Sequence, residues 1–142
     1  MFKVHENSLS SKEYTELYES VGWQVPSEAQ VTLALSNSNF TVCIKDGDKA
    51  IGMGRVIGDG AMSYFIKDVA VLPAYQGKGV GTMIINSIVK HIEDTVPMGF
   101  YVSLELISSE GKEPFYEKLH FGKKPGRGMG HGMMGRVEGR RK

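Results

Sequence analysis

The sequence predicts a single α/β domain in which a mixed, largely antiparallel sheet carries helices on both faces. Its 142 residues are enough for one hydrophobic core. Three strand-like segments separated by glycine-containing turns occupy residues 40–45, 50–57 and 63–72, and two helical segments precede them. A glycine-rich loop, a long amphipathic helix and another strand then follow, and this order indicates a parallel strand pair.

Composition restricts the class of protein before any element is assigned. The 41% apolar and 23% charged residues are ordinary for a globular protein. The net charge of +1 argues neither for nor against a nucleic-acid or membrane partner, and we expect neither. The single cysteine, Cys43, excludes an internal disulfide and suits a reducing compartment. The N-terminus has no apolar signal segment, and no apolar run approaches the roughly 18 residues of a membrane span. We therefore expect a cytoplasmic protein with one domain over residues 1–142.

The first part of the chain predicts a short edge strand and two helices. Residues 2–5 fit the strand. Ser10 and Glu13 have the spacing of a capping box and begin a helix with apolar residues at helical spacing. Ser27 and Gln30 look like a second capping box before a shorter helix.

Two antiparallel strands are then expected. Residues 40–45 alternate and are rich in β-formers, residues 46–49 have turn chemistry, and residues 50–57 pair back. Gly52 and Gly54 weaken this second strand and indicate a bulge or the close approach of another element.

The third strand leads into the most informative segment. Residues 63–72 end in a continuous apolar run, which predicts a central strand covered on both faces. The glycine loop Gln76–Gly81 follows, and then a helical stripe comprising Ile84, Ile85, Ile88, Val89 and Ile92. Because a helix N-terminus offers unpaired N–H groups and a positive dipole end, this junction predicts a phosphate-binding site.

The remainder predicts a strand over residues 100–107 and a short helix with Pro114 in its first turn. Residues 122–142 are glycine-rich and basic. One interpretation of them is a last strand at residues 132–137 and a flexible end.

Two motifs resemble one family. Gln76-Gly77-Lys78-Gly79-Val80-Gly81 matches the Q/R-x-x-G-x-G/A signature of the GNAT acetyltransferase superfamily, and Phe115–Phe121 is similar to its F-Y-E-K-x-G-F segment. The resemblance implies a six- to seven-stranded sheet, splayed at its centre. His120 departs from the family's glycine before the last Phe, where the helix ends in a left-handed conformation. Ser109 stands where many relatives carry an Asn.

The resemblance also implies a function. It implies acetyl-CoA as co-substrate, no metal, and transfer of the acetyl group to a primary amine of a small molecule by direct attack in a ternary complex. The cofactor-binding residues it implies are Val69, Ala70, Val71, Gln76, Gly77, Lys78, Gly79, Val80, Gly81, Thr82, Ser109, Phe115 and Tyr116. Transfer to a protein or peptide amine, and binding of acyl-CoA without catalysis, remain alternatives. A homodimer is left open.

Three residues are candidates for catalysis. By resemblance, Tyr116 protonates the departing thiolate, although it also fits a core aromatic. Asp68 and Glu105 are candidates for the base that accepts the amine proton. A satisfied structural carboxylate is the alternative for Asp68, and a solvated strand residue is the alternative for Glu105.

The acceptor side carries weaker signals. Trp23 and Tyr18 lie in a region that borders the acceptor site in the family, and an aromatic wall suits a small amine with an apolar body. Packing on the core is the alternative for both. The histidines lack metal-ligand spacing, and the basic C-terminal segment lacks aromatic residues that would stack on bases.

Overall fold

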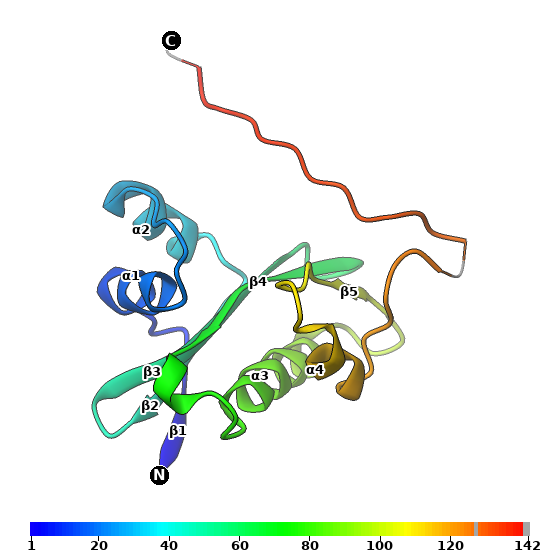
Figure 1. The fold of residues 1–142 in the computed structure, drawn as a ribbon. Coiled ribbons are helices and arrows are strands. Elements are labelled where there is room, and N and C mark those ends of the chain that lie inside the picture. Colours follow the sequence, from blue (N-terminus) through cyan, green and yellow to red (C-terminus); the bar gives the residue numbers. More distant parts are fainter. Residues whose placement is uncertain (127, 141–142) are drawn as a thin grey trace. The chain divides into compact units, whose positions relative to one another are not determined.

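The computed structural model describes residues 1–126 and 128–140 (Figure 1). Its elements, in chain order, are β1 (Phe2–Glu6), α1 (Ser11–Ser20), α2 (Glu28–Ser36), β2 (Phe40–Asp46), β3 (Lys49–Gly58), β4 (Ser63–Val71), the 3₁₀ turn η1 (Pro73–Tyr75), α3 (Val80–Thr95), β5 (Ser103–Glu105) and α4 (Glu113–Lys118). Contacts divide the chain into two compact units, Met1–Leu106 and Ile107–Lys142. One domain over residues 1–142 stays a prediction.

The first unit contains a five-stranded sheet in the order β1-β2-β3-β4-β5. Neighbouring strands are antiparallel except β4 and β5, which are parallel as predicted. Helices α1 and α2 lie on one face of the sheet and α3 on the other (Figure 1). The predicted fold class is confirmed, with five strands instead of the expected six to seven.

The helix starts follow the capping chemistry. The Ser10 hydroxyl accepts from the Glu13 N–H at 3.1 Å, and the Glu13 carboxylate accepts from the Ser10 N–H at 3.0 Å, which completes the predicted capping box of α1. At α2 the Ser27 hydroxyl accepts from the Gln30 N–H at 3.2 Å. Below these helices lies a core of Leu9, Tyr14, Leu17, Val31, Cys43, Met53 and Ala70.

The opposite face depends on the two glycines of β3. A Cβ added to Gly52 would lie 2.6 Å from Cγ1 of Val80, and one added to Gly54 would lie 2.6 Å from Cγ2 of Ile84. Real Cβ atoms do not approach so closely, so both glycines let α3 pack directly on the strand. The predicted close approach is thus confirmed, and it fixes the position of the first turn of α3.

Two expectations about the sheet were wrong. Within the run predicted to be covered on both faces only Ala70 is fully buried, and Val69, Val71 and Leu72 are partly exposed. The strand expected over residues 100–107 is confined to Ser103–Glu105, and Phe100 and Tyr101 are exposed. Ser103 pairs with Ser63, the first residue of β4, so the residues before Ser103 lie beyond the end of that strand.

The second unit has little regular structure. Pro114 occupies the first turn of α4, as predicted. His120, just past the helix end, has a φ of 72°, so the left-handed helix end expected at this position is observed. Gly126 and Met129 form an isolated bridge, and residues 132–137 adopt no strand in the structure.

Candidate functional site

The loop between β4 and α3 exposes backbone donors. Gly77 and Gly79 have φ values of 77° and 84°, a conformation that glycine adopts without strain. Gly79 is the N-cap residue of α3 and supplies no side-chain hydrogen bond. The N–H groups of Val80, Gly81 and Thr82 precede the first intrahelical donor, since Met83 N–H donates to the Gly79 carbonyl at 3.1 Å. This turn contains no acidic residue, so it suits an anion.

Side chains on both sides hold this loop in place. The Gln76 amide donates to the Val71 carbonyl at 3.1 Å, which closes the loop onto the end of β4. The Tyr75 hydroxyl donates to Asp46 at 3.1 Å, and its ring packs edge-on against Phe2 with centroids 5.8 Å apart. Lys78 Nζ lies 5.4 Å from the centroid of the Tyr75 ring. The loop is therefore anchored to β1 and to the β2–β3 hairpin.

The edge of β4 opposite β3 is open along its second half, in that no strand of the described residues pairs with it beyond Phe65. Pairing with β5 covers only Ser63↔Ser103, Tyr64↔Leu104 and Phe65↔Glu105. The Leu72 N–H donates to the Ile51 carbonyl at 2.9 Å, so Leu72 faces β3. Because successive residues of a strand alternate, the backbone groups of Val71 and Val69 face the opposite edge. The splay expected of the sheet appears as this early end of the β4–β5 ladder.

A bulge interrupts β4 just before these residues. Met53 pairs with Ala70 and Arg55 pairs with Lys67, so Gly54 alone stands opposite Asp68 and Val69. Asp68 has a φ of 57°, in the left-handed region that non-glycine residues rarely occupy. The sequence indicated a bulge at the glycines of β3, and the β2–β3 ladder has one beside Gly52, where Ile51 is the extra residue. In the β3–β4 ladder the extra residue belongs to β4. Such strained positions in bulges are common next to active sites.

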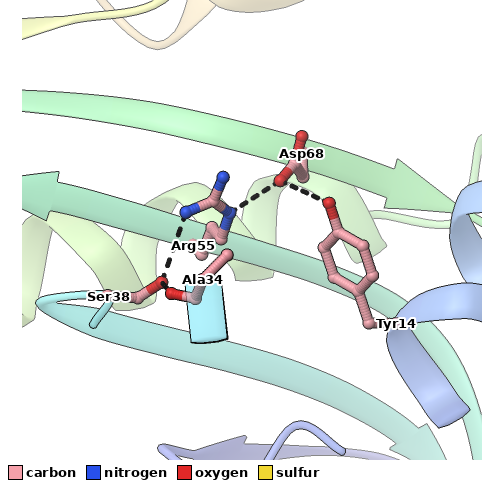
Figure 2. Close-up of polar contacts among 5 residues, drawn as sticks. All are labelled: Tyr14, Ala34, Ser38, Arg55 and Asp68. Atoms are coloured by element: carbon pink, nitrogen blue, oxygen red, sulfur yellow. Dashed lines mark hydrogen bonds and ion pairs between the residues drawn. The ribbon is translucent and has the colours of Figure 1, made fainter. Parts of the chain in front are cut away.

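The Asp68 carboxylate is held by two donors (Figure 2). Its Oδ2 accepts from Nε of Arg55 at 2.6 Å and from the Tyr14 hydroxyl at 2.8 Å. Arg55 in turn reaches the Ser38 hydroxyl at 3.4 Å, and Ser38 donates to the Ala34 carbonyl at 2.8 Å. The side chains of Asp68 and Arg55 are only 11% and 15% exposed. This contact pattern favours the structural alternative for Asp68.

Tyr14 enters this network as a permanent donor. Burial raises the pKa of the Tyr14 hydroxyl far above its usual value, and the adjacent negative charge of Asp68 raises that pKa further. Sequence reasoning missed Tyr14 and Arg55 as partners of Asp68. A signal for Arg55 existed, because it is a lone charge within an otherwise apolar strand segment.

Glu105, the other carboxylate predicted from sequence, ends β5 opposite Phe65. It is partly buried and accepts a hydrogen bond from the Ser103 hydroxyl at 3.1 Å. Glu105 and Asp68 therefore lie on adjacent strands. The β4–β5 ladder ends at the Phe65–Glu105 pair, before β4 reaches Asp68.

Ser109, Phe115 and Tyr116 belong to the second unit. Ser109 accepts the Lys112 N–H through its carbonyl at 3.0 Å. The Tyr116 ring packs edge-on against both Phe115 and Phe121, with centroids 4.9 and 6.0 Å away. Burial raises the pKa of Tyr116, which keeps its hydroxyl protonated at neutral pH. Their catalytic and binding roles stay predictions.

The aromatic residues near α1 form a chain of contacts. Tyr14 stacks on Tyr18 with centroids 5.2 Å apart, and Tyr18 meets Trp23 edge-on at 5.0 Å. Tyr18 and Trp23 are partly buried and pack against the core. Their contacts agree with the packing alternative, while their partial exposure leaves a surface that an acceptor can touch.

The described residues form neither a metal site nor a membrane-spanning helix. Within residues 1–126 and 128–140, no three His, Cys, Asp or Glu side chains are grouped so that they could hold a metal ion. None of the helices in this same part of the chain is long and apolar enough to cross a bilayer.

Comparison with known proteins gives a consistent result. The family model of the acetyltransferase (GNAT) domain matches residues 36–123. The uncharacterized N-acetyltransferase ycf52 of Pyropia yezoensis is 30% identical over 127 residues, which cover 82% of this chain and 71% of the relative. A similar structure is that of a probable acetyltransferase of unknown function from meticillin-resistant Staphylococcus aureus. The two structures have a TM-score of 0.83 and 34% sequence identity, and the match covers 96% of this chain and 100% of that one. The chain therefore belongs to the GNAT acetyltransferase family.

Proposed function

We propose that this chain transfers an acetyl group from acetyl-CoA to the primary amine of a small molecule, by direct attack within a ternary complex. One observation carries the proposal: an open edge of β4, a loop of left-handed glycines and an uncapped helix N-terminus follow one another without interruption. This arrangement presents backbone donors in series, first to an extended polar chain and then to phosphates.

The loop fits the pyrophosphate of coenzyme A. Nothing lies within 4 Å of the position where a Cβ would stand at Gly77 or Gly79, so a ligand has room beside both glycines. The amides of Val80, Gly81 and Thr82 are the donors we assign to the phosphates. Lys78 contributes a positive charge, although an exposed lysine adds little by itself.

The β4 edge fits the pantetheine arm and the thioester. The backbone groups of Val71 and Val69 that face this edge can pair with the amides of pantetheine, as in strand addition. Acetyl-CoA, when bound, supplies an activated thioester. We assign the Val69 N–H, at the bulge, to the thioester carbonyl as an oxyanion donor. Loss of one such donor typically costs a factor of roughly 10²–10³ in rate.

Two side chains are assigned to proton transfer. Tyr116 is the proposed general acid, because burial raises its pKa and keeps a proton available for the thiolate. Glu105 is the proposed base, acting directly or through water on the attacking amine. Asp68 is the second candidate, and the contacts of its carboxylate with Arg55 and Tyr14 favour a structural role for it.

The proposed acceptor is a small amine that contacts Tyr18 and Trp23. Both side chains remain partly exposed at the edge of the α1 core, and their rings meet at 5.0 Å. An aromatic wall of this kind suits an amine with an apolar body and excludes water from one side of the attack.

The test is a thiol-release assay with acetyl-CoA against polyamines, arylalkylamines, amino acids, aminoglycosides and short peptides. The proposal expects release of coenzyme A with at least one free amine and a matching acetylated product by mass spectrometry. Turnover with peptides alone would favour a protein acetyltransferase. Tight acetyl-CoA binding without transfer to any amine would contradict catalysis and favour a binding module.

A further inference from the structure

We propose that Tyr14 and Arg55 are positioning residues for acetyl transfer: through Asp68 they hold the β4 bulge and so orient the Val69 N–H. The inference rests on the proposed function, because it concerns the backbone donor assigned above to the thioester carbonyl. Neither residue would touch the reacting atoms.

The bulge requires external support because of its backbone conformation. Asp68 has a φ of 57°, and a non-glycine residue in this region persists only where its surroundings enforce it. Aspartate tolerates the left-handed region better than most residues, but an extended β conformation would still relieve the strain. The peptide that follows Asp68 carries the Val69 N–H, so any relaxation of Asp68 rotates this donor.

The network supplies that support from two elements. Tyr14 approaches the Asp68 carboxylate from α1 at 2.8 Å, and Arg55 approaches it from β3 at 2.6 Å (Figure 2). Arg55 is itself tied at 3.4 Å to Ser38, which follows α2. The carboxylate is thus held directly by side chains from α1 and β3, and Ser38 supports it indirectly through Arg55.

Burial makes the charges of Asp68 and Arg55 depend on each other. The Asp68 and Arg55 side chains are mostly buried, so removing either partner leaves the other charge desolvated and unpaired. Tyr14 adds a neutral donor to the same oxygen, Oδ2, and its hydroxyl stays protonated at all physiological pH values because burial and Asp68 raise its pKa. The three side chains therefore act as a fixed clamp on the bulge.

The experiment compares Tyr14→Phe and Arg55→Lys with Lys45→Ala as the matched control. Lys45 forms a comparable, partly buried ion pair with Glu13 at 3.0 Å, with side chains 24% and 19% exposed, but it does not contact Asp68. The kcat and the KM for acetyl-CoA are measured with the best amine, and the pH profile of kcat/KM is recorded for Asp68→Asn. In ¹⁵N-labelled protein, the amide resonances of Val69–Val71 are compared with and without acetyl-CoA.

The proposal expects kcat to fall roughly tenfold or more in Tyr14→Phe and further in Arg55→Lys, with the KM for acetyl-CoA within about twofold of wild type, since small misplacements of a reacting group are costly. Lys45→Ala keeps its kcat. Asp68→Asn lowers kcat but retains the acid limb of the wild-type pH profile. Loss of that limb would make Asp68 the base and overturn the positioning role.

The amide resonances separate this inference from the proposed function. If wild type acetylates no amine, the proposed function fails, yet the free protein still tests the clamp. Shifted resonances or faster hydrogen exchange at Val69 in Tyr14→Phe and Arg55→Lys, but not in Lys45→Ala, support it. Unchanged Val69 resonances in both variants would refute it, whatever their activity.

Discussion

Replacement of Gly52 by alanine should damage stability and coenzyme A binding together. The new Cβ would lie 2.6 Å from Cγ1 of Val80, about 1 Å closer than optimal carbon–carbon contact. Val80 is 1% exposed and β-branched, so its side chain has little freedom to rotate within the helix. The first turn of α3, with the amides proposed to bind phosphate, must therefore move away from β3.

Overpacking of this kind costs about 1–3 kcal/mol of unfolding free energy. For a chain of this length that corresponds to a fall in Tm of roughly 3–10 °C. Because the displaced turn carries the proposed phosphate donors, we also expect the Kd for acetyl-CoA to rise roughly tenfold. Differential scanning calorimetry measures the first effect and isothermal titration calorimetry the second.

Ile88→Val provides the control. Ile88 is fully buried in the middle of α3, and this substitution should cost about 0.5–1.5 kcal/mol without moving the first turn. It should lower the Tm while leaving the Kd for acetyl-CoA unchanged. A Gly52→Ala protein with the wild-type Tm and Kd would refute the reasoning that links β3 packing to the loop.

Three further predictions concern single side chains. Tyr116→Phe should lower kcat at least tenfold with little change in the KM for acetyl-CoA, and an unchanged kcat in the thiol-release assay would exclude its role as the acid. Burial, helped by the nearby charge of Glu13, raises the pKa of Cys43 to about 11. The native protein should therefore resist alkylation by iodoacetamide at pH 8 and react only when unfolded. Fast labelling of the native protein, measured by mass spectrometry, would contradict this prediction. Hydrogen bonds from the backbone N–H groups of Met62, Ser63 and Ala61 lower the pKa of Asp59 to about 2. This stabilisation is present above the unfolded pKa of about 3.9 and is lost as the pH falls toward 2. The Tm difference between wild type and Asp59→Ala should therefore shrink across that range. A Tm difference that stays constant with pH would show that the charge of Asp59 does not contribute to stability.

Local patterns predicted much of this fold. Ser10 with Glu13, the turn after Asp46, and the apolar stripe of α3 each depend on neighbours in sequence, and each is observed. The conformation of the glycine loop could also be predicted from sequence, because positive φ values and uncapped amides follow from residue type and spacing.

Long-range features could not be read in the same way. The length of β5 depends on where the chain meets and leaves the edge of β4, which no pattern in residues 100–107 reveals. The ion pair of Asp68 with Arg55 depends on the strand register, and the Tyr14 contact spans 54 positions in the chain. The burial that separates a structural carboxylate from a catalytic one is a property of the folded chain.

The assignment of the β4–loop–α3 junction to coenzyme A is tested most directly by amide chemical-shift mapping. Acetyl-CoA is titrated into ¹⁵N-labelled protein, and the shifts of every assigned amide are followed. We expect the largest changes at residues 76–82 and at Val69–Val71. Absence of changes there, or changes centred instead on the hollow lined by Asn7, Leu35 and Ser36, would contradict it.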